Sequence, residues 1–256
     1  MTQCHDFACA LPAQTTAQTA AQPATKNAAH SAEPSADQAA STTALPAAAQ
    51  TTPTIDFFHD VVCGWCYVMS PRLRQVASEL GLRVRQRSFV LQASRAEMVA
   101  TFGSMEQAKH TILGHWEACA RHDDAQRIDI EGMRRETFEY PSGMAGALAC
   151  QAAQILGGDE AHWDLFDAIQ HAHMSAHRNI ADADVLLDIA TRTGFERNAF
   201  ARCMESAEAL NLVQQDRALA QRMGLHAIPT LVAPGLPPLQ TQSVAALRER
   251  LRSLVG

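Results

Sequence analysis

Long apolar runs are missing from this sequence. No stretch of its 256 residues approaches the roughly 18 consecutive apolar residues that a membrane-spanning helix requires. The first residues, MTQCHDFACALPAQ, also lack the basic start and the unbroken apolar segment of a secretory signal. We therefore expect a cytoplasmic protein with no membrane partner.

An excess of charge of one sign is also absent. The formal net charge is −6, and it is spread along the chain rather than gathered in a basic patch, so we expect no nucleic-acid partner. Arg83, Arg85 and Arg87 alternate in RVRQR, which is typical of a strand with one solvated face. No glycine-rich phosphate loop and no G-x-S-x-G motif is present, which gives nucleotide-dependent enzymes and serine hydrolases no support.

Large apolar side chains are scarce in residues 1–54, which consist mainly of Ala, Thr, Gln, Ser and Pro. Such a segment cannot bury enough surface to offset the entropy cost of ordering. We expect a disordered tail, and its removal should leave the melting temperature and the activity nearly unchanged.

The first structural unit follows this tail. Thr54 to His59 (TIDFFH) is short and apolar, as expected for a strand buried on both faces. Apolar residues then recur at intervals of three and four and predict a helix that ends at Gly81, in the order Cys66, Met69, Leu73, Val76 and Leu80. Residues 82–91 alternate like a second strand. Strand, helix and strand in this order predict a βαβ unit with parallel strands.

Helical periodicity fills most of the remaining chain. We assign residues 96–223 to an all-helical insertion, because apolar residues repeat there at three or four and glycines separate the segments. β character returns at Ile228 to Val232, and the last helix begins after Ser243, a plausible N-cap. The predicted fold class is α/β, β-α-β … β-β-α, with residues 55–95 and 224–256 forming one domain around the insertion.

Cys63 and Cys66 stand at the junction of the first strand and the first helix, in FFHDVVCGWCYVMSP. Seven cysteines without a secretion signal point to metal-binding or redox chemistry rather than a disulfide scaffold. Cys63 would lie at the helix N-terminus, where free N–H groups and the macrodipole stabilise a thiolate and lower its pKa. Cys66 begins the apolar helix face. The pattern predicts an exposed attacking thiol and a buried resolving thiol.

Two prolines add to this pattern. Pro71 lies inside the predicted helix, where it removes a backbone hydrogen bond. Pro229 follows Ile228 at the entry to the late strand, and an X-Pro bond in such a place can be cis.

These residues together resemble the thioredoxin fold, and the string Asp60-Val-Val-Cys63-Gly-Trp-Cys66-Tyr67 with the helical insertion resembles the FrnE-like branch of the DsbA family. The resemblance covers residues 55–256. It implies a thiol–disulfide oxidoreductase or protein disulfide isomerase in which Cys63 attacks and Cys66 resolves. It also implies that the loop at Ile228 and Pro229 faces the pair and binds the substrate backbone.

The same resemblance implies a redox-active disulfide in place of a bound cofactor, with glutathione as a candidate co-substrate. The partner would be a protein or a small molecule that contains a disulfide or a dithiol. No metal site is expected. The direction of electron flow and the oligomeric state do not follow from these residues.

Three residues around the pair carry further expectations. Gly64 stands where FrnE-like proteins usually have Pro, and Gly-Trp between the cysteines should give a less oxidising pair than Pro-His. His59 is a candidate source of positive charge near the thiolate, although a strand-end histidine is more often only solvated. Trp65 is expected to be partly exposed as an apolar contact for substrate; the alternative is packing against the helical insertion. A second departure from the family pattern is SFVLQA at residues 88–93.

Two alternative functions stay open. Glutathione-dependent isomerases and transferases of this fold, such as 2-hydroxychromene-2-carboxylate isomerase, also resemble the chain in the insertion, but they typically place Ser at the attacking position. A non-enzymatic zinc module is the other alternative, with C-x-x-C supplying half of an intersubunit site that needs two further ligands.

Overall fold

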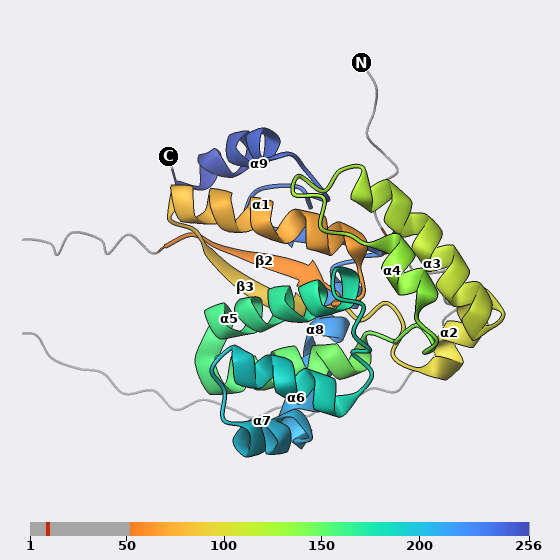
Figure 1. Ribbon diagram of the computed structural model, residues 1–256. Helices are drawn as coiled ribbons and strands as arrows, with labels where there is room; N and C mark the ends of the chain where they lie inside the picture. Colours follow the sequence, from red (N-terminus) through yellow and green to blue (C-terminus); the bar gives the residue numbers. More distant parts are fainter. Residues whose placement is uncertain (1–8, 11–51, 256) are drawn as a thin grey trace, which may run out of the picture. The chain divides into compact units, whose positions relative to one another are not determined.

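The computed structural model describes residues 9–10 and 52–255 (Figure 1). The predicted disordered tail otherwise lies outside the described residues. Within it, Cys9–Ala10 forms a short strand, β1. Its backbone pairs with a strand near the other end of the chain.

The predicted βαβ unit is confirmed. β2 (Thr54–His59) leads into α1 (Gly64–Leu80), and β3 (Arg83–Ser88) returns parallel to β2 over its whole length. The helix ends where expected, at Gly81, which has a left-handed φ of 63° and donates its N–H to the last turn.

The last part of the chain completes the sheet. β4 (Ala227–Ile228) and β5 (Thr230–Val232) precede α9 (Val244–Leu251) and a 3-10 turn, η1 (Arg252–Leu254). β5 is antiparallel to β2, so the strand order is β3-β2-β5. Ser243 caps α9 as predicted, because its side chain accepts a hydrogen bond from the N–H of Ala246.

Helices occupy the chain between β3 and β4. They are α2 (Arg95–Phe102), α3 (Met105–Ala120), α4 (Ile130–Arg135), α5 (Met144–Met174), α6 (Ala183–Arg192), α7 (Arg197–Met204) and α8 (Ala207–Arg222). One of the glycines that separate the helical segments lies at a kink within α5, where Gly158 has a φ of 79°.

The sheet lies between helices. Figure 1 shows α1 and α9 on one side of β2 and β3, and α5 on the other. Ile55, Phe57 and Phe58 of β2 are completely buried, as expected for a strand covered on both faces. The fold is α/β with a helical insertion, as predicted, and the arrangement places the carboxyl end of β2 and the first turn of α1 in the interior.

The alternating arginines of β3 are paired with carboxylates. Arg85 and Arg87 each lie 2.8 Å from a carboxylate oxygen of Asp56, and Arg87 also lies 2.9 Å from Asp216. The polar face of β3 is therefore built into an ion-pair network with β2 and α8.

Candidate active site

The two cysteines lie in one turn at the start of α1. Cys63 is the N-cap residue, with an extended backbone, and its Sγ accepts a hydrogen bond of 3.3 Å from the N–H of Cys66. The N–H of Cys63 in turn donates to the Asp60 carbonyl at 3.1 Å. A sulfur at an N-cap takes the place of the usual Ser or Asp oxygen, and the N–H that it accepts favours its thiolate form.

We expected an exposed Cys63 and a buried Cys66, and only the second expectation is confirmed. Cys66 is buried, as predicted, but Cys63 is also buried, with 1% of its surface exposed. The prediction of an exposed attacking thiol is wrong because residues distant in the sequence cover the turn. Among them is Ile228, whose carbonyl oxygen lies 3.9 Å from Cys63 Sγ.

The late-strand loop therefore lies next to Cys63, where the family resemblance implied it would be. Ile228 is buried at the end of β4, and the Ile228–Pro229 peptide bond is cis. The contact joins residues separated by 165 positions. The fold thus brings Cys63, Ile228 and Pro229 to one place.

Trp65 differs from its prediction. Its side chain is 5% exposed, and its ring centroid lies 5.3 Å from that of His122, just beyond the end of α3. The expected partial exposure is therefore wrong, and the alternative of packing against the helical insertion holds. The reason is that the insertion folds back over the first turn of α1.

His59 is neither solvated nor charged at neutral pH. It is buried against Phe166, at a ring distance of 4.0 Å, and against His162, at 5.3 Å. Burial, together with the neighbouring His162, lowers the pKa of His59 well below its usual value. The expected positive charge near Cys63 is therefore wrong for this residue.

Asp60 is a buried acid whose role the motif did not reveal. Its carboxylate accepts hydrogen bonds from the N–H groups of Leu91, at 2.7 Å, and Val62, at 3.3 Å. Burial raises the pKa of Asp60 to about 6, although the two N–H donors act in the opposite direction. An acid three residues before Cys63 was visible in the sequence, but its burial was not.

Two side chains of the insertion hold the turn before α1. The Gln170 amide of α5 donates to the carbonyls of Cys63, at 3.0 Å, and Asp60, at 3.3 Å. The Tyr140 hydroxyl donates to the Val62 carbonyl at 3.2 Å. Sequence reasoning missed both residues; the only available signal was a polar Gln170 among apolar residues of one helix.

Within the described ranges, no group of three or more His, Cys, Asp or Glu side chains is arranged to hold a metal ion. None of the helices in the same ranges is long and apolar enough to cross a bilayer.

Comparison with known proteins places the chain in a family. The model of the DSBA-like thioredoxin domain matches residues 54–252. The chain belongs to the DSBA-like thioredoxin family.

The chain is also similar to individual known proteins. The chain is similar to the ClpXP adapter protein SpxH of Bacillus subtilis, with 26% identity over 177 residues, covering 69% of this chain but 56% of that protein. A putative protein disulfide isomerase from Nitrosomonas europaea has a TM-score of 0.67 at 20% identity, covering 79% of this chain and 97% of the other. The cytosolic disulfide reductase DsbM of Pseudomonas aeruginosa, solved with GSH, has a TM-score of 0.60 at 26% identity, covering 78% and 96%.

Gly64 stands where the resemblance to FrnE-like proteins implied a proline, and its surroundings explain why the position is small. A Cβ atom at Gly64 would lie 2.8 Å from the Sγ of Cys119 and 3.2 Å from its Cβ. Real Cβ atoms do not approach a sulfur so closely. A third buried cysteine, from α3, therefore packs directly behind the residue that follows Cys63.

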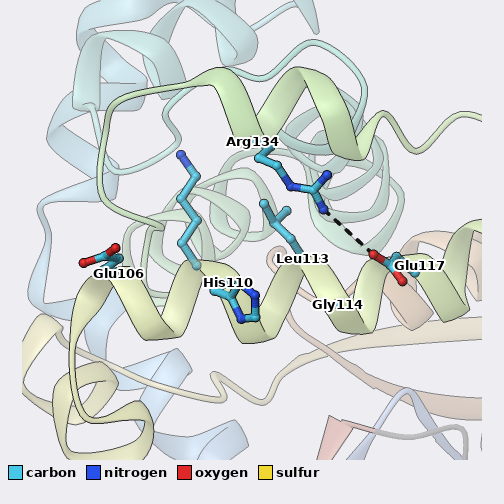
Figure 2. A pocket seen from close by; sticks show the side chains of 7 residues that line it. Glu106, His110, Leu113, Gly114, Glu117 and Arg134 are labelled. Atoms are coloured by element: carbon cyan, nitrogen blue, oxygen red, sulfur yellow. Dashed lines mark ion pairs between the residues drawn. The ribbon is translucent and has the colours of Figure 1, made fainter.

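A surface pocket of this DSBA-like chain lies beside α3 and α4. It has a volume of about 430 Å³ and is lined by Glu106, Lys109, His110, Leu113, Gly114, Glu117 and Arg134. Figure 2 shows the Arg134 side chain reaching from α4 toward Glu117 of α3, an ion pair of 3.8 Å. None of the predicted site residues lines this pocket, so the candidate active site rests on the cysteines.

Proposed function

We propose that this chain is a thiol–disulfide oxidoreductase that uses Cys63 and Cys66 as its redox pair. The observation that carries the proposal is the hydrogen bond of 3.3 Å from the Cys66 N–H to Cys63 Sγ at the start of α1. It favours negative charge on one sulfur of the pair. The complete burial of Cys66 suits a thiol that reacts only with its neighbour.

The proposed cycle begins when the Cys63 thiolate attacks one sulfur of a substrate disulfide. A mixed disulfide forms, and the other substrate sulfur leaves as a thiolate that takes up a proton. Cys66 then loses its proton and attacks Cys63 Sγ, which expels the second substrate sulfur. The substrate gains two electrons and two protons, and the enzyme keeps a Cys63–Cys66 disulfide.

We propose that the pair works as a reductant and that glutathione regenerates it. Two glutathione thiols would reduce the Cys63–Cys66 disulfide and leave as glutathione disulfide, which balances the electrons. The similarity to DsbM, solved with GSH, supports this co-substrate, and the Gly-Trp dipeptide supports a pair that is not strongly oxidising. A measured reduction potential near the cytosolic glutathione poise would agree; a much higher one would make the chain an oxidant, and a much lower one would prevent glutathione from reducing the pair.

The test of the proposal uses single serine variants. Cys63→Ser should abolish reduction of a peptide disulfide, because a hydroxyl is a far poorer nucleophile than a thiolate. Cys66→Ser should still attack but not resolve, so mass spectrometry should detect an accumulated mixed disulfide on Cys63. Cys203→Ser, outside the site, should keep the full rate.

The same variants address the zinc alternative. Bound zinc that is lost from Cys63→Ser and Cys66→Ser, with an unchanged rate of disulfide reduction, would make the pair structural. The isomerase alternative has less support, because a cysteine occupies the attacking position here.

A second candidate is a protein-binding role, because the curated relatives are ClpXP adapter proteins. The chain spans 56% and 58% of their lengths. Binding to purified ClpX that survives in the double variant Cys63→Ser/Cys66→Ser would establish an adapter function independent of thiol chemistry. Absence of binding in the unmodified chain would remove this candidate.

A further inference from the structure

Gln170 of α5 directs a buried amide at the turn that carries Cys63. The side chain is completely buried. Its Nε2 atom donates to the Cys63 carbonyl at 3.0 Å and lies 3.3 Å from the Asp60 carbonyl and 3.5 Å from that of Val61. The shortest of the three contacts therefore goes to the residue that bears the attacking sulfur.

The turn has other donors for the same carbonyls. The Cys63 carbonyl also accepts from the N–H of Tyr67 at 3.2 Å, and the Asp60 carbonyl accepts from the N–H of Cys63 at 3.1 Å. Gln170 Oε1, in contrast, is buried and has no hydrogen-bond partner among the described residues. An unpaired buried polar atom costs stability, so the stability of the fold alone does not explain a glutamine at this position.

The amide of Gln170 fixes the backbone on which the sulfur depends. Cys63 is the N-cap of α1, with an extended conformation of φ −89° and ψ 111°, and its Sγ accepts the N–H of Cys66 at 3.3 Å. A side chain accepts such a cap bond only while the N-cap backbone stays extended. The carbonyl and the sulfur belong to one residue, so a donor that holds the carbonyl also holds the sulfur in line with the N–H.

This alignment acts unequally on the two redox forms. Cys63 and Cys66 are both free thiols in this structure, so the contacts belong to the reduced form. The N–H of Cys66 stabilises a thiolate, whereas a sulfur in a disulfide carries no charge. A group that stabilises the reduced form raises the reduction potential of the pair.

We propose that Gln170 is a positioning residue that raises the reduction potential of the Cys63–Cys66 pair. It acts through the Cys63 carbonyl and takes no part in electron transfer. This inference rests on the proposed function, because it names what tunes the same pair.

The first experiment removes the donor from the full-length chain. Gln170→Met keeps nearly the same side-chain length but has no N–H. The protein is equilibrated with mixtures of reduced and oxidised glutathione, and peptide mapping after alkylation measures the fraction of Cys63–Cys66 disulfide. Loss of one hydrogen bond of ordinary strength should shift this equilibrium toward the disulfide by up to about tenfold, which lowers the potential by about 30 mV.

A second variant keeps the polar group. Gln170→Asn has the same amide but withdraws it by one carbon from the Cys63 carbonyl. It should shift the equilibrium in the same direction as Gln170→Met. The measurement thus stays decisive even where Gln170→Met does not fold.

Gln151 provides the matched control on the same helix. It is also buried, and its Nε2 donates to Ser88 at 3.1 Å and to the carboxylate of Asp216 at 2.8 Å. A hydrogen bond to a carboxylate is stronger than one to a neutral carbonyl, so Gln151→Met should lose at least as much stability as Gln170→Met. Its equilibrium with glutathione should nevertheless equal that of the unmodified chain.

A further measurement follows the cap bond itself. Hydrogen exchange at the amide of Cys66, relative to that of Leu73 in the same helix, should be faster in Gln170→Met than in the unmodified chain. Gln151→Met should leave this ratio unchanged, because its contacts are with β3 and α8.

The outcomes separate the inference from the proposed function. An unchanged equilibrium in Gln170→Asn, a shift toward the dithiol, or equal shifts in Gln170→Met and Gln151→Met would overturn the inference and leave the pair active. If glutathione disulfide forms no Cys63–Cys66 disulfide in the unmodified chain, the proposed function fails and the inference fails with it.

Discussion

Two buried polar regions adjoin at the carboxyl end of β2, and they are satisfied in different ways. In the turn from Asp60 to Cys63, the carboxylate, the sulfur and the carbonyls take part in hydrogen bonds with backbone N–H groups and with Gln170. One residue earlier, His59 packs against His162, and none of the four ring nitrogens has a hydrogen-bond partner among the described residues.

The difference shows what each region is built to hold. The turn fixes the position of Cys63 Sγ, and hydrogen bonds supply the direction that this requires. The histidine pair behaves as part of the core, because the two rings contact each other, the His59 ring contacts Phe166, and both rings stay neutral. Burial therefore lowers the pKa of His162 to about 3 and raises that of Asp60 to about 6. Both shifts favour the uncharged form.

The largest expected effect concerns Asp60. Its folded pKa of about 6 lies above the ordinary 3.8, so the stability that the neutral carboxyl contributes is complete below pH 3.8 and is lost as the pH rises through 6. A shift of about two pH units corresponds to roughly 3 kcal/mol. Asp60→Asn should remove this loss between pH 4 and 6, as measured by urea unfolding at each pH.

The exposed acid Glu106 provides the control for this measurement. Glu106→Gln should leave the pH dependence of the unfolding free energy as it is in the unmodified chain. A pH profile of Asp60→Asn that matches that of the unmodified chain would show that the N–H donors outweigh burial at this carboxylate.

The histidine pair should respond to pH in the opposite direction. The folded pKa of His162 lies below its ordinary 6.5, so its contribution is complete above pH 6.5 and is lost as the pH falls. At pH 5 the loss is about 2 kcal/mol for one such histidine. His162→Leu should lose less stability between pH 7 and 5 than the unmodified chain, whereas the exposed His115→Leu should not differ from it. An unchanged acid profile in His162→Leu would contradict the neutral core pair.

The local elements could be predicted from the sequence because their signals lie within a few residues. The three-and-four spacing from Cys66 to Leu80 and the glycine at position 81 defined α1, and the order of the elements then required parallel strands. The positions of Cys63 and Cys66 in the first turn followed from the same pattern.

Burial around the site could not be predicted, because the covering residues are far away in the sequence. Trp65 is buried partly through contact with His122, and His59 is buried by residues of α5. β1 contains only two residues, which is too short for periodicity to predict a strand, and its partner strand lies near the other end of the chain. Periodicity reports which face of an element is apolar, but it does not report which distant segment covers that face.

Gly64 gives the smallest predicted effect and tests such a distant contact directly. A Cβ at this position would lie 2.8 Å from Cys119 Sγ, so Gly64→Ala should destabilise the fold by about 1 kcal/mol, at the low end of overpacking because one sulfur can shift. In a Cys119→Ala background the sulfur is gone, and the tightest remaining contact is the Cβ of residue 119 at 3.2 Å. There, Gly64→Ala should become neutral or stabilising, because alanine loses less backbone entropy on folding.

Gly114→Ala on α3 is the control for this prediction. No atom lies within 4 Å of its added Cβ, so this substitution should stabilise the fold by about 0.5–1 kcal/mol in both backgrounds. Urea unfolding of the four members of this double-mutant cycle measures the coupling. Equal destabilisation by Gly64→Ala with and without Cys119 would mean that the sulfur does not set the size of this residue.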